Sequence, residues 1–133
     1  MKNKVAIVAA NYYENITNDL VDGVKNNLNE SFNTSTYLVD GAWEIIYKIN
    51  DLSENDSIDK FVAIGVIIKG DTDHYEYISK GVVDGLIYLT IKNNIYIANC
   101  VLNVLNIDQA IARTKGDKNK GIEAASALNN LFV

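Results

Sequence analysis

Short apolar segments alternate with longer amphipathic segments along the whole chain, and this alternation is the strongest constraint on its fold. Four runs of mostly apolar and β-branched residues predict strands over Lys4–Ala10, Thr34–Val39, Phe61–Ile68 and Ile95–Leu102. Apolar residues at helical spacing predict helices from Glu14–Thr17 to about Asn29, and over Ala42–Leu52, Tyr75–Asn93, Ile107–Arg113 and Asn119–Phe132. Such alternation is typical of a mostly parallel sheet covered by helices. We therefore expect an α/β, flavodoxin-like three-layer sandwich with a four-stranded parallel sheet of order 2-1-3-4 and helices on both faces.

The length and composition exclude several classes of protein. At 133 residues, 48% of them hydrophobic, the chain suits a single domain over residues 1–133. A net charge of −5 argues against a nucleic-acid partner, which requires a basic face. No apolar run is long enough to cross a bilayer, and Val5–Ala10 is too short for a signal peptide. We therefore expect a cytoplasmic protein without a membrane partner.

The chain has one cysteine and one histidine, which limits its metal and redox chemistry. A disulfide within the chain and a multi-cysteine zinc site are both excluded, and any other metal would need mostly carboxylate ligands. We expect no metal site. Cys100 stands between apolar neighbours and is expected to be a small buried residue.

Polar residues follow the third predicted strand directly after Gly70. In an open α/β sheet this is where ligands bind, and the free N–H groups of the next helix favour an anion there. Thr72 adds a hydroxyl donor, and His74 adds a group that exchanges protons near neutral pH. The alternatives are structural: Asp71 and Thr72 as the helix cap, and His74 as an exposed helix residue. The negative charge of Asp71 would itself oppose an anion.

The other predicted strands also end at chemically useful residues. Tyr12 and Trp43 could stack on a flat ring, and Glu44 could accept a hydrogen bond from a ring N–H. The spacing of Trp43 with Ile46 and Ile49 favours a core position for Trp43 instead. Glu44 could equally be a first-turn carboxylate that stabilises the helix dipole.

A cluster of basic residues lies late in this acidic chain, between positions 113 and 120. It consists of Arg113, Lys115, Lys118 and Lys120. Such a patch suits a small anionic ligand, although an isolated run of charge is more often a solvated loop.

Four segments in the right order resemble the motifs of one enzyme family, the 6,7-dimethyl-8-ribityllumazine synthases of riboflavin biosynthesis. Residues 41–45 read Gly-Ala-Trp-Glu-Ile, and residues 65–77 read Gly-Val-Ile-Ile-Lys-Gly-Asp-Thr-Asp-His-Tyr-Glu-Tyr. Residues 109–113 read Gln-Ala-Ile-Ala-Arg, and residues 119–125 read Asn-Lys-Gly-Ile-Glu-Ala-Ala. Any one of these motifs is weak, but together they cover nearly the whole chain and are specific.

The resemblance implies a transferase-type reaction that needs no cofactor. The amine of 5-amino-6-(D-ribitylamino)uracil condenses with the ketone of 3,4-dihydroxy-2-butanone 4-phosphate, and phosphate and water are lost. His74 would be the catalytic proton donor. The residues implied to bind the pyrimidine and its ribityl chain are Tyr12, Ala42, Trp43, Glu44, Val66, Ile67, Ile68 and Asn99. Those implied to bind the phosphate substrate are Asp71, Thr72, Arg113 and Lys120, with Arg113 coming from an adjacent subunit.

The resemblance also implies an assembly. Family members form homopentamers with active sites between subunits, some pentamers assemble further into icosahedral shells, and riboflavin synthase is a candidate partner.

Departures from the family pattern leave an alternative open. Asn99 replaces the family's usual phenylalanine, Asn103 replaces its threonine, and Asn11 replaces its arginine. Loss of the ring at position 99 should weaken stacking by about 1 kcal/mol. The alternative is a diverged, non-catalytic homologue that binds flavin or lumazine or forms a shell.

Overall fold

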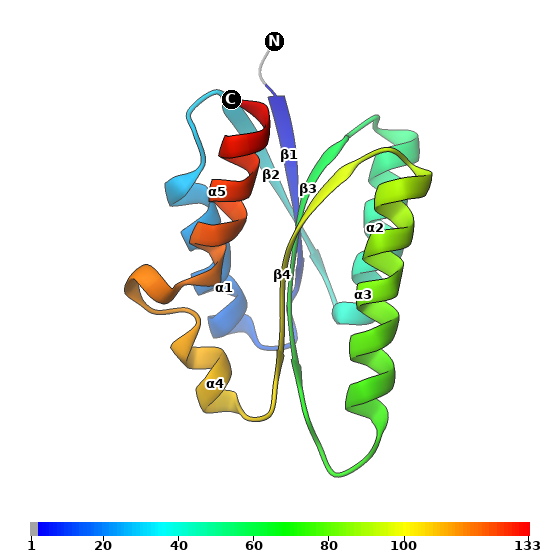
Figure 1. Cartoon of the computed structure of the whole chain (residues 1–133), viewed down its shortest axis with the longest axis vertical. Coiled ribbons are helices and arrows are strands. Elements are labelled where there is room, and N and C mark those ends of the chain that lie inside the picture. The colour runs from blue at the N-terminus through cyan, green and yellow to red at the C-terminus, as the bar shows by residue number, and fades with distance from the viewer. Residues whose placement is uncertain (1–2) are drawn as a thin grey trace.

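The computed structural model describes residues 3–133 as a parallel sheet between two layers of helices (Figure 1). The predicted fold class and alternation are confirmed. In chain order the elements are β1 (Asn3–Ala10), α1 (Glu14–Asn27), β2 (Phe32–Val39), α2 (Ala42–Asn55), β3 (Lys60–Ile68), α3 (His74–Lys92), β4 (Tyr96–Val104), α4 (Ile107–Ala112), the 3-10 turn η1 (Gly116–Lys118) and α5 (Lys120–Phe132). Met1 and Lys2, which precede the segment considered as a signal peptide, lie outside the described residues. No helix in the described part of the chain is long and apolar enough to span a membrane.

The four strands pair in the order β2-β1-β3-β4, as predicted, and all pairs are parallel. The strand β3 is therefore interior, and β2 and β4 form the two edges. Seven consecutive residues of β3, from 61 to 67, are buried. A parallel strand shows this continuous burial because helices cover both faces of its sheet. Figure 1 shows α1 and α5 over one face and α2 and α3 over the other.

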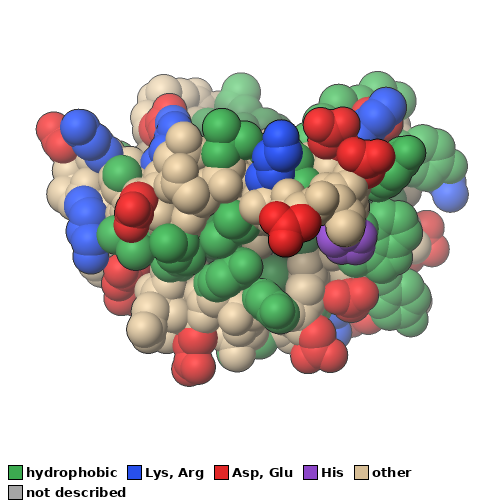
Figure 2. Space-filling view, turned by 90° about the horizontal axis from the view of Figure 1, so that it is seen from below, with side chains coloured by type: hydrophobic (Ala, Val, Ile, Leu, Met, Phe, Trp, Pro, Cys, Tyr) green, Lys and Arg blue, Asp and Glu red, His purple; other side chains and the backbone are tan. Residues whose placement is uncertain are grey.

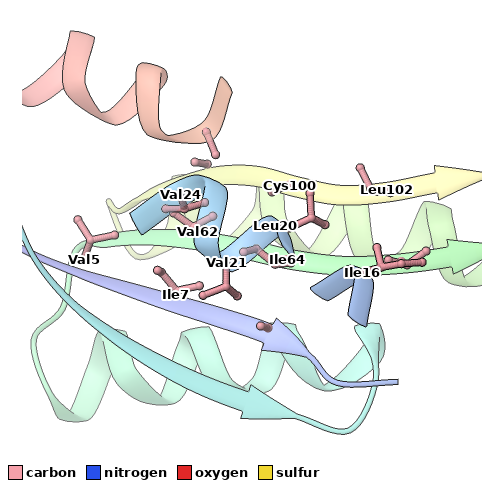
Figure 3. Packing of buried hydrophobic residues seen from close by; sticks show 14 of the residues in the cluster. Val5, Ile7, Ile16, Leu20, Val21, Val24, Val62, Ile64, Cys100 and Leu102 are labelled. Atoms are coloured by element: carbon pink, nitrogen blue, oxygen red, sulfur yellow. The ribbon is translucent and has the colours of Figure 1, made fainter. Parts of the chain in front are cut away.

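The core lies on both faces of the sheet. On the α1/α5 face, Leu20 and Val24 of α1 pack over Ile7, Val62 and Ile64 of the sheet (Figure 3). On the opposite face, the buried side chains of α2 and α3 cover the alternate strand residues, whose side chains point to that face. The alternate side chains of each strand thus serve two separate cores, which is why the strands are apolar throughout.

Cys100 is 2% exposed on the α1/α5 face, so its predicted burial is confirmed. Burial raises the pKa of the Cys100 thiol to about 12, with a smaller contribution from the charge of Glu123. The thiol therefore stays protonated near neutral pH, and Cys100 packs as a small apolar side chain.

The start of α5 is held against α1 by the buried side chain of Asn119. Its Oδ1 accepts a hydrogen bond from Gly121 N at 2.7 Å, and its Nδ2 donates to the carbonyls of Asp19 and Thr114 at 3.0 and 3.1 Å. Asn119 is thus the N-cap of α5 and also ties it to α1. Gly121 lies directly against the backbone of α1, next to Leu20 and Val24.

We expect Gly121→Ala to lower the free energy of unfolding by about 3 kcal/mol. An added Cβ would collide with the carbonyl oxygen of Leu20 and come within 2.8 Å of Val24 N, so backbone would have to move. Gly70→Ala is the matched control, because its Cβ would meet nothing within 4 Å. Urea unfolding of both variants tests this, and equal stability of the two would contradict the close approach.

The structure corrects two predictions about α2. Trp43 was expected in the core, yet it is 61% exposed, and the buried stripe consists of Ile45, Ile49 and Leu52. Trp43 precedes Ile45 by two residues, or roughly 200° around the helix, so it faces away from the sheet. The helix is also one turn longer than predicted, since Asp56 N still donates to the carbonyl of Leu52.

Candidate active site

The carboxyl ends of the strands meet at one edge of the sheet, and several predicted site residues follow them there. Tyr12 comes just after β1 and is 75% exposed, Trp43 and Glu44 begin α2 after β2, and His74 begins α3 after β3. Figure 2 shows this edge from below, with the single histidine among Asp and Glu side chains and hydrophobic side chains nearby. We call these residues, together with Asp71 and Thr72 of the turn before α3, the strand-end half of the candidate site.

The end of β3 can contact a ligand mainly through its backbone N–H and C=O groups. Val66 and Ile67 are buried in the core, and Ile68 is partly buried. Their side chains are therefore engaged with the protein, whereas the chain leaves the sheet just beyond them. Lys69 N donates to the carbonyl of Val104 at 2.9 Å, which fixes the exit of the chain from β3.

The segment between β3 and α3 is exposed and forms the start of the helix. Asp73 is the N-cap residue, and its own side chain makes no cap hydrogen bond. Thr72 Oγ1 accepts a hydrogen bond from His74 N at 3.3 Å. The expected alternative of Asp71 as the cap is therefore wrong, while Thr72 does bond to the backbone of the turn. The dipole of this 19-residue helix favours an anion at the turn, and the carboxylates of Asp71 and Asp73 oppose one.

The start of α2 packs closely against β3 because residue 65 is glycine. A Cβ there would lie 3.3 Å from Ile45 Cδ1 and 3.8 Å from Ala42 Cβ. Ala42 is partly buried by this approach, while Trp43 and Glu44 extend from it into a groove between α2 and α3. The Trp43 ring also lies over Gly81 of α3, where a Cβ would be 3.1 Å from it. The Trp43 ring thus packs against Gly81 of α3, and the rest of its surface is largely exposed.

A second group of predicted residues lines a cavity of about 350 Å³ along the outer side of β4. We call it the β4 pocket. It contains Asn99, Arg113 and Lys120, all three assigned from the resemblance. Arg113 Nη1 donates to the carbonyl of Gln109 at 2.8 Å. Lys120 Nζ lies 2.6 Å from Glu123 Oε2, so part of its charge is neutralised within the chain.

Two further residues of the β4 pocket were not assigned from the sequence. Asn103 was noted only as a departure from the family pattern, and Glu123 was not considered. The spacing of Lys120 and Glu123, three residues apart on a helix, was the available signal for their pairing. Asn103 shares a strand face with Asn99, a relation that becomes clear only once β4 is known to be an edge strand.

The two groups lie on different layers of one chain. Arg113 follows α4 and Lys120 begins α5, both on the α1/α5 side of the sheet, while His74 begins α3 on the opposite side (Figure 1). The residues assigned to the phosphate are therefore divided: Asp71 and Thr72 belong to the strand-end half, and Arg113 and Lys120 belong to the β4 pocket. Among residues 3–133, no group of three His, Cys, Asp or Glu side chains is placed to hold a metal ion.

Comparison with known proteins agrees with the sequence motifs. The family model described as 6,7-dimethyl-8-ribityllumazine synthase matches residues 2–132. A 6,7-dimethyl-8-ribityllumazine synthase of Campylobacter hominis is 35% identical over 133 residues, covering 96% of this chain and 85% of its own length. The enzymes of the same name from Sphingopyxis alaskensis and Limosilactobacillus reuteri are 38% and 35% identical over 125 and 134 residues. These alignments cover 92% and 98% of this chain, and 88% of each relative.

Proposed function

The chain belongs to the 6,7-dimethyl-8-ribityllumazine synthase family, and from this we propose that it catalyses the condensation of 5-amino-6-(D-ribitylamino)uracil with 3,4-dihydroxy-2-butanone 4-phosphate. The amine attacks the ketone and forms a Schiff base with loss of water. Phosphate leaves, and the second ring closes with loss of another water. The reaction needs two substrates held together and several proton transfers, which side chains and backbone can supply.

The observation that carries this proposal is the arrangement at the start of α3. Thr72 is bonded to the backbone of the turn, and His74 is the first residue of the helix. A phosphate bound by Thr72 and the helix N–H groups would place the rest of the second substrate within reach of the imidazole. His74 would then give a proton to the departing phosphate or take one from the Schiff base.

The pyrimidine would bind beside this turn, over the ends of β1 and β3. Tyr12 is exposed and free to stack on the ring, and Trp43 and Glu44 extend from the start of α2. Ala42 is small enough to let the ring approach. The backbone of Val66, Ile67 and Ile68 would supply hydrogen bonds to the polar edge of the ring.

The division of the assigned residues into two groups favours a site shared between subunits. If Arg113 and Lys120 act on the same phosphate as Thr72, they come from another copy of the chain, since within one chain they lie on the other helical layer. The contact would join two different surfaces, the strand-end half of one copy and the β4 pocket of the next. Repeated head-to-tail contacts form a closed ring when the rotation between neighbouring copies closes, and the pentamers that the family resemblance implies are rings of this kind.

The first test is to mix the purified protein with both substrates and follow lumazine formation by absorbance against the uncatalysed condensation. We expect clear acceleration, together with a light-scattering mass several times that of one chain. A stable assembly that binds lumazine without accelerating its formation would overturn the enzymatic proposal and favour the non-catalytic alternative.

A further inference from the structure

The backbone of the turn between β1 and α1 is fixed on both sides of Tyr12. The buried hydroxyl of Thr17 donates a hydrogen bond to the carbonyl of Ala10 at 2.7 Å. The N–H of the residue after Ala10 donates to the carbonyl of Val39 at 2.8 Å, and Thr17 N donates to the carbonyl of Tyr13 at 2.9 Å. The backbone at residue 12 is thus held in place, and its remaining freedom is the rotation of the side chain.

The ring of Tyr12 contacts the ring of the next residue, Tyr13. The two ring centroids lie 4.9 Å apart at an interplanar angle of 73°, which is an edge-to-face contact. This geometry is attractive because the positive edge of one ring meets the negative face of the other. Tyr12 is still 75% exposed, so the contact leaves most of its surface open to a ligand.

Tyr13 is held by the protein more firmly than Tyr12. Its ring is partly buried and packs against the core on the α1/α5 face. It is also the N-cap residue of α1, and its carbonyl accepts a hydrogen bond from the first turn of that helix. An exposed side chain without a partner samples several rotamers, whereas contact with a held ring restricts this rotation. Tyr13 therefore orders the Tyr12 ring before a ligand arrives.

We propose that Tyr13 is a positioning residue, whose ring holds the ring of Tyr12 in the orientation that stacks on the pyrimidine. This rests on the proposed function, because it deepens the stacking role assigned to Tyr12. A side chain that is ordered before binding loses less conformational entropy when the ligand stacks on it, so the affinity is higher. Tyr13 acts through Tyr12 and does not itself contact the ligand.

The test measures binding of 6,7-dimethyl-8-ribityllumazine to the full-length protein by fluorescence titration, which requires no turnover. Tyr13→Leu removes the ring but keeps an apolar side chain against the core, and it should weaken binding about three- to ten-fold, the contribution of one aromatic pair. Tyr13→Phe keeps the ring and should bind like the wild type. In the Tyr12→Leu background, Tyr13→Leu should have no further effect, because the ring that it orients is absent.

Phe132→Leu is the matched control for the loss of an aromatic pair. It breaks the edge-to-face contact with Tyr96, whose ring centroid lies 5.8 Å away, and this pair is near the C-terminus at the opposite end of the sheet (Figure 1). Binding by Phe132→Leu should equal that of the wild type. Urea unfolding of each variant checks that it is folded, and Tyr13→Met is a second variant without a ring for use if Tyr13→Leu does not fold.

Steady-state kinetics give an independent readout of the same effect. Tyr13→Leu should raise the KM for the pyrimidine by the same three- to ten-fold and leave the KM for the phosphate substrate unchanged. A general loss of packing at the start of α1 would instead change both KM values, and that result would contradict the positioning role.

The binding outcomes separate this proposal from the proposed function. Equal binding by wild type and Tyr13→Leu would overturn it, as would weak binding by Tyr13→Phe or no binding by the wild type. A loss that persists in full in the Tyr12→Leu background would mean that Tyr13 contacts the ligand directly, which also contradicts the proposal. The expected pattern of binding without any acceleration of the condensation would support the positioning role, and only the proposed function would fail.

Discussion

The His74→Ala variant should condense the two substrates about 10²- to 10⁴-fold more slowly than wild type, the range typical of a lost general acid or base. The effect should appear mainly in kcat, because His74 acts on the protons that move after both substrates are bound. His74 is exposed at the first turn of α3, so its removal should change stability by less than about 0.5 kcal/mol. Steady-state kinetics with the purified, assembled variant measure the loss.

Tyr77→Ala is the control for a general disturbance of this turn. Tyr77 is exposed, lies three residues further along α3, and has no assigned role in the reaction. We expect near-normal turnover in this variant. If His74→Ala retains wild-type turnover, His74 takes no part in the proton transfers. If both variants lose activity equally, the loss reflects the shape of the helix start rather than the imidazole.

The Arg113→Ala variant should raise the apparent KM for 3,4-dihydroxy-2-butanone 4-phosphate by roughly 10- to 100-fold, while the KM for the pyrimidine changes much less. A hydrogen bond to a charged group contributes about 1.5–3 kcal/mol, which corresponds to this range. Lys118→Ala provides the control, because Lys118 is an exposed cation of the same loop outside the β4 pocket. Equal changes in both KM values would contradict the assignment of Arg113 to the phosphate.

Mixing these two variants tests whether the site is shared between subunits. When His74→Ala and Arg113→Ala chains are unfolded together and refolded, about a quarter of the contacts should combine an intact His74 with an intact Arg113 from the neighbouring copy. At a phosphate-substrate concentration far below the raised KM of Arg113→Ala, where both parent variants are slow, activity should therefore return to about a quarter of the wild-type value per site. No recovery in mixed assemblies, confirmed by mass, would place both residues in the same chain's site.

The fold could be predicted from the sequence because local periodicity reports burial directly. The continuous apolar run of β3 and the four-residue spacing of Ile16, Leu20 and Val24 in α1 required no knowledge of distant residues. The same local argument failed for Trp43. Its three-residue spacing with Ile46 also fits a helix, and only the direction in which α2 faces the sheet shows that Ile45 occupies the core position.

For the candidate site too, some features could be predicted from local sequence and others depend on how distant segments pack. The chain order of the motifs was enough to identify the family, and the turn from Gly70 to His74 was recognisable because one continuous segment contains it. The relation between Asn99 and Asn103 could not be read from their spacing, since residues four apart on a strand have significance only if the strand is an edge. Likewise, the separation of Arg113 from His74 depends on which face of the sheet each helix covers.

The sequence by itself determined the fold class, the strand order expected of it and the family, because these follow from local burial patterns and from contiguous motifs. Only the tertiary structure decided that Asn99 and Asn103 both form hydrogen bonds with the backbone of Val101 on the edge strand β4, and that the assigned residues fall into two groups on opposite layers. The physical reason is that cavities and side-chain contacts are created by packing between segments far apart in the chain, and no local pattern encodes them.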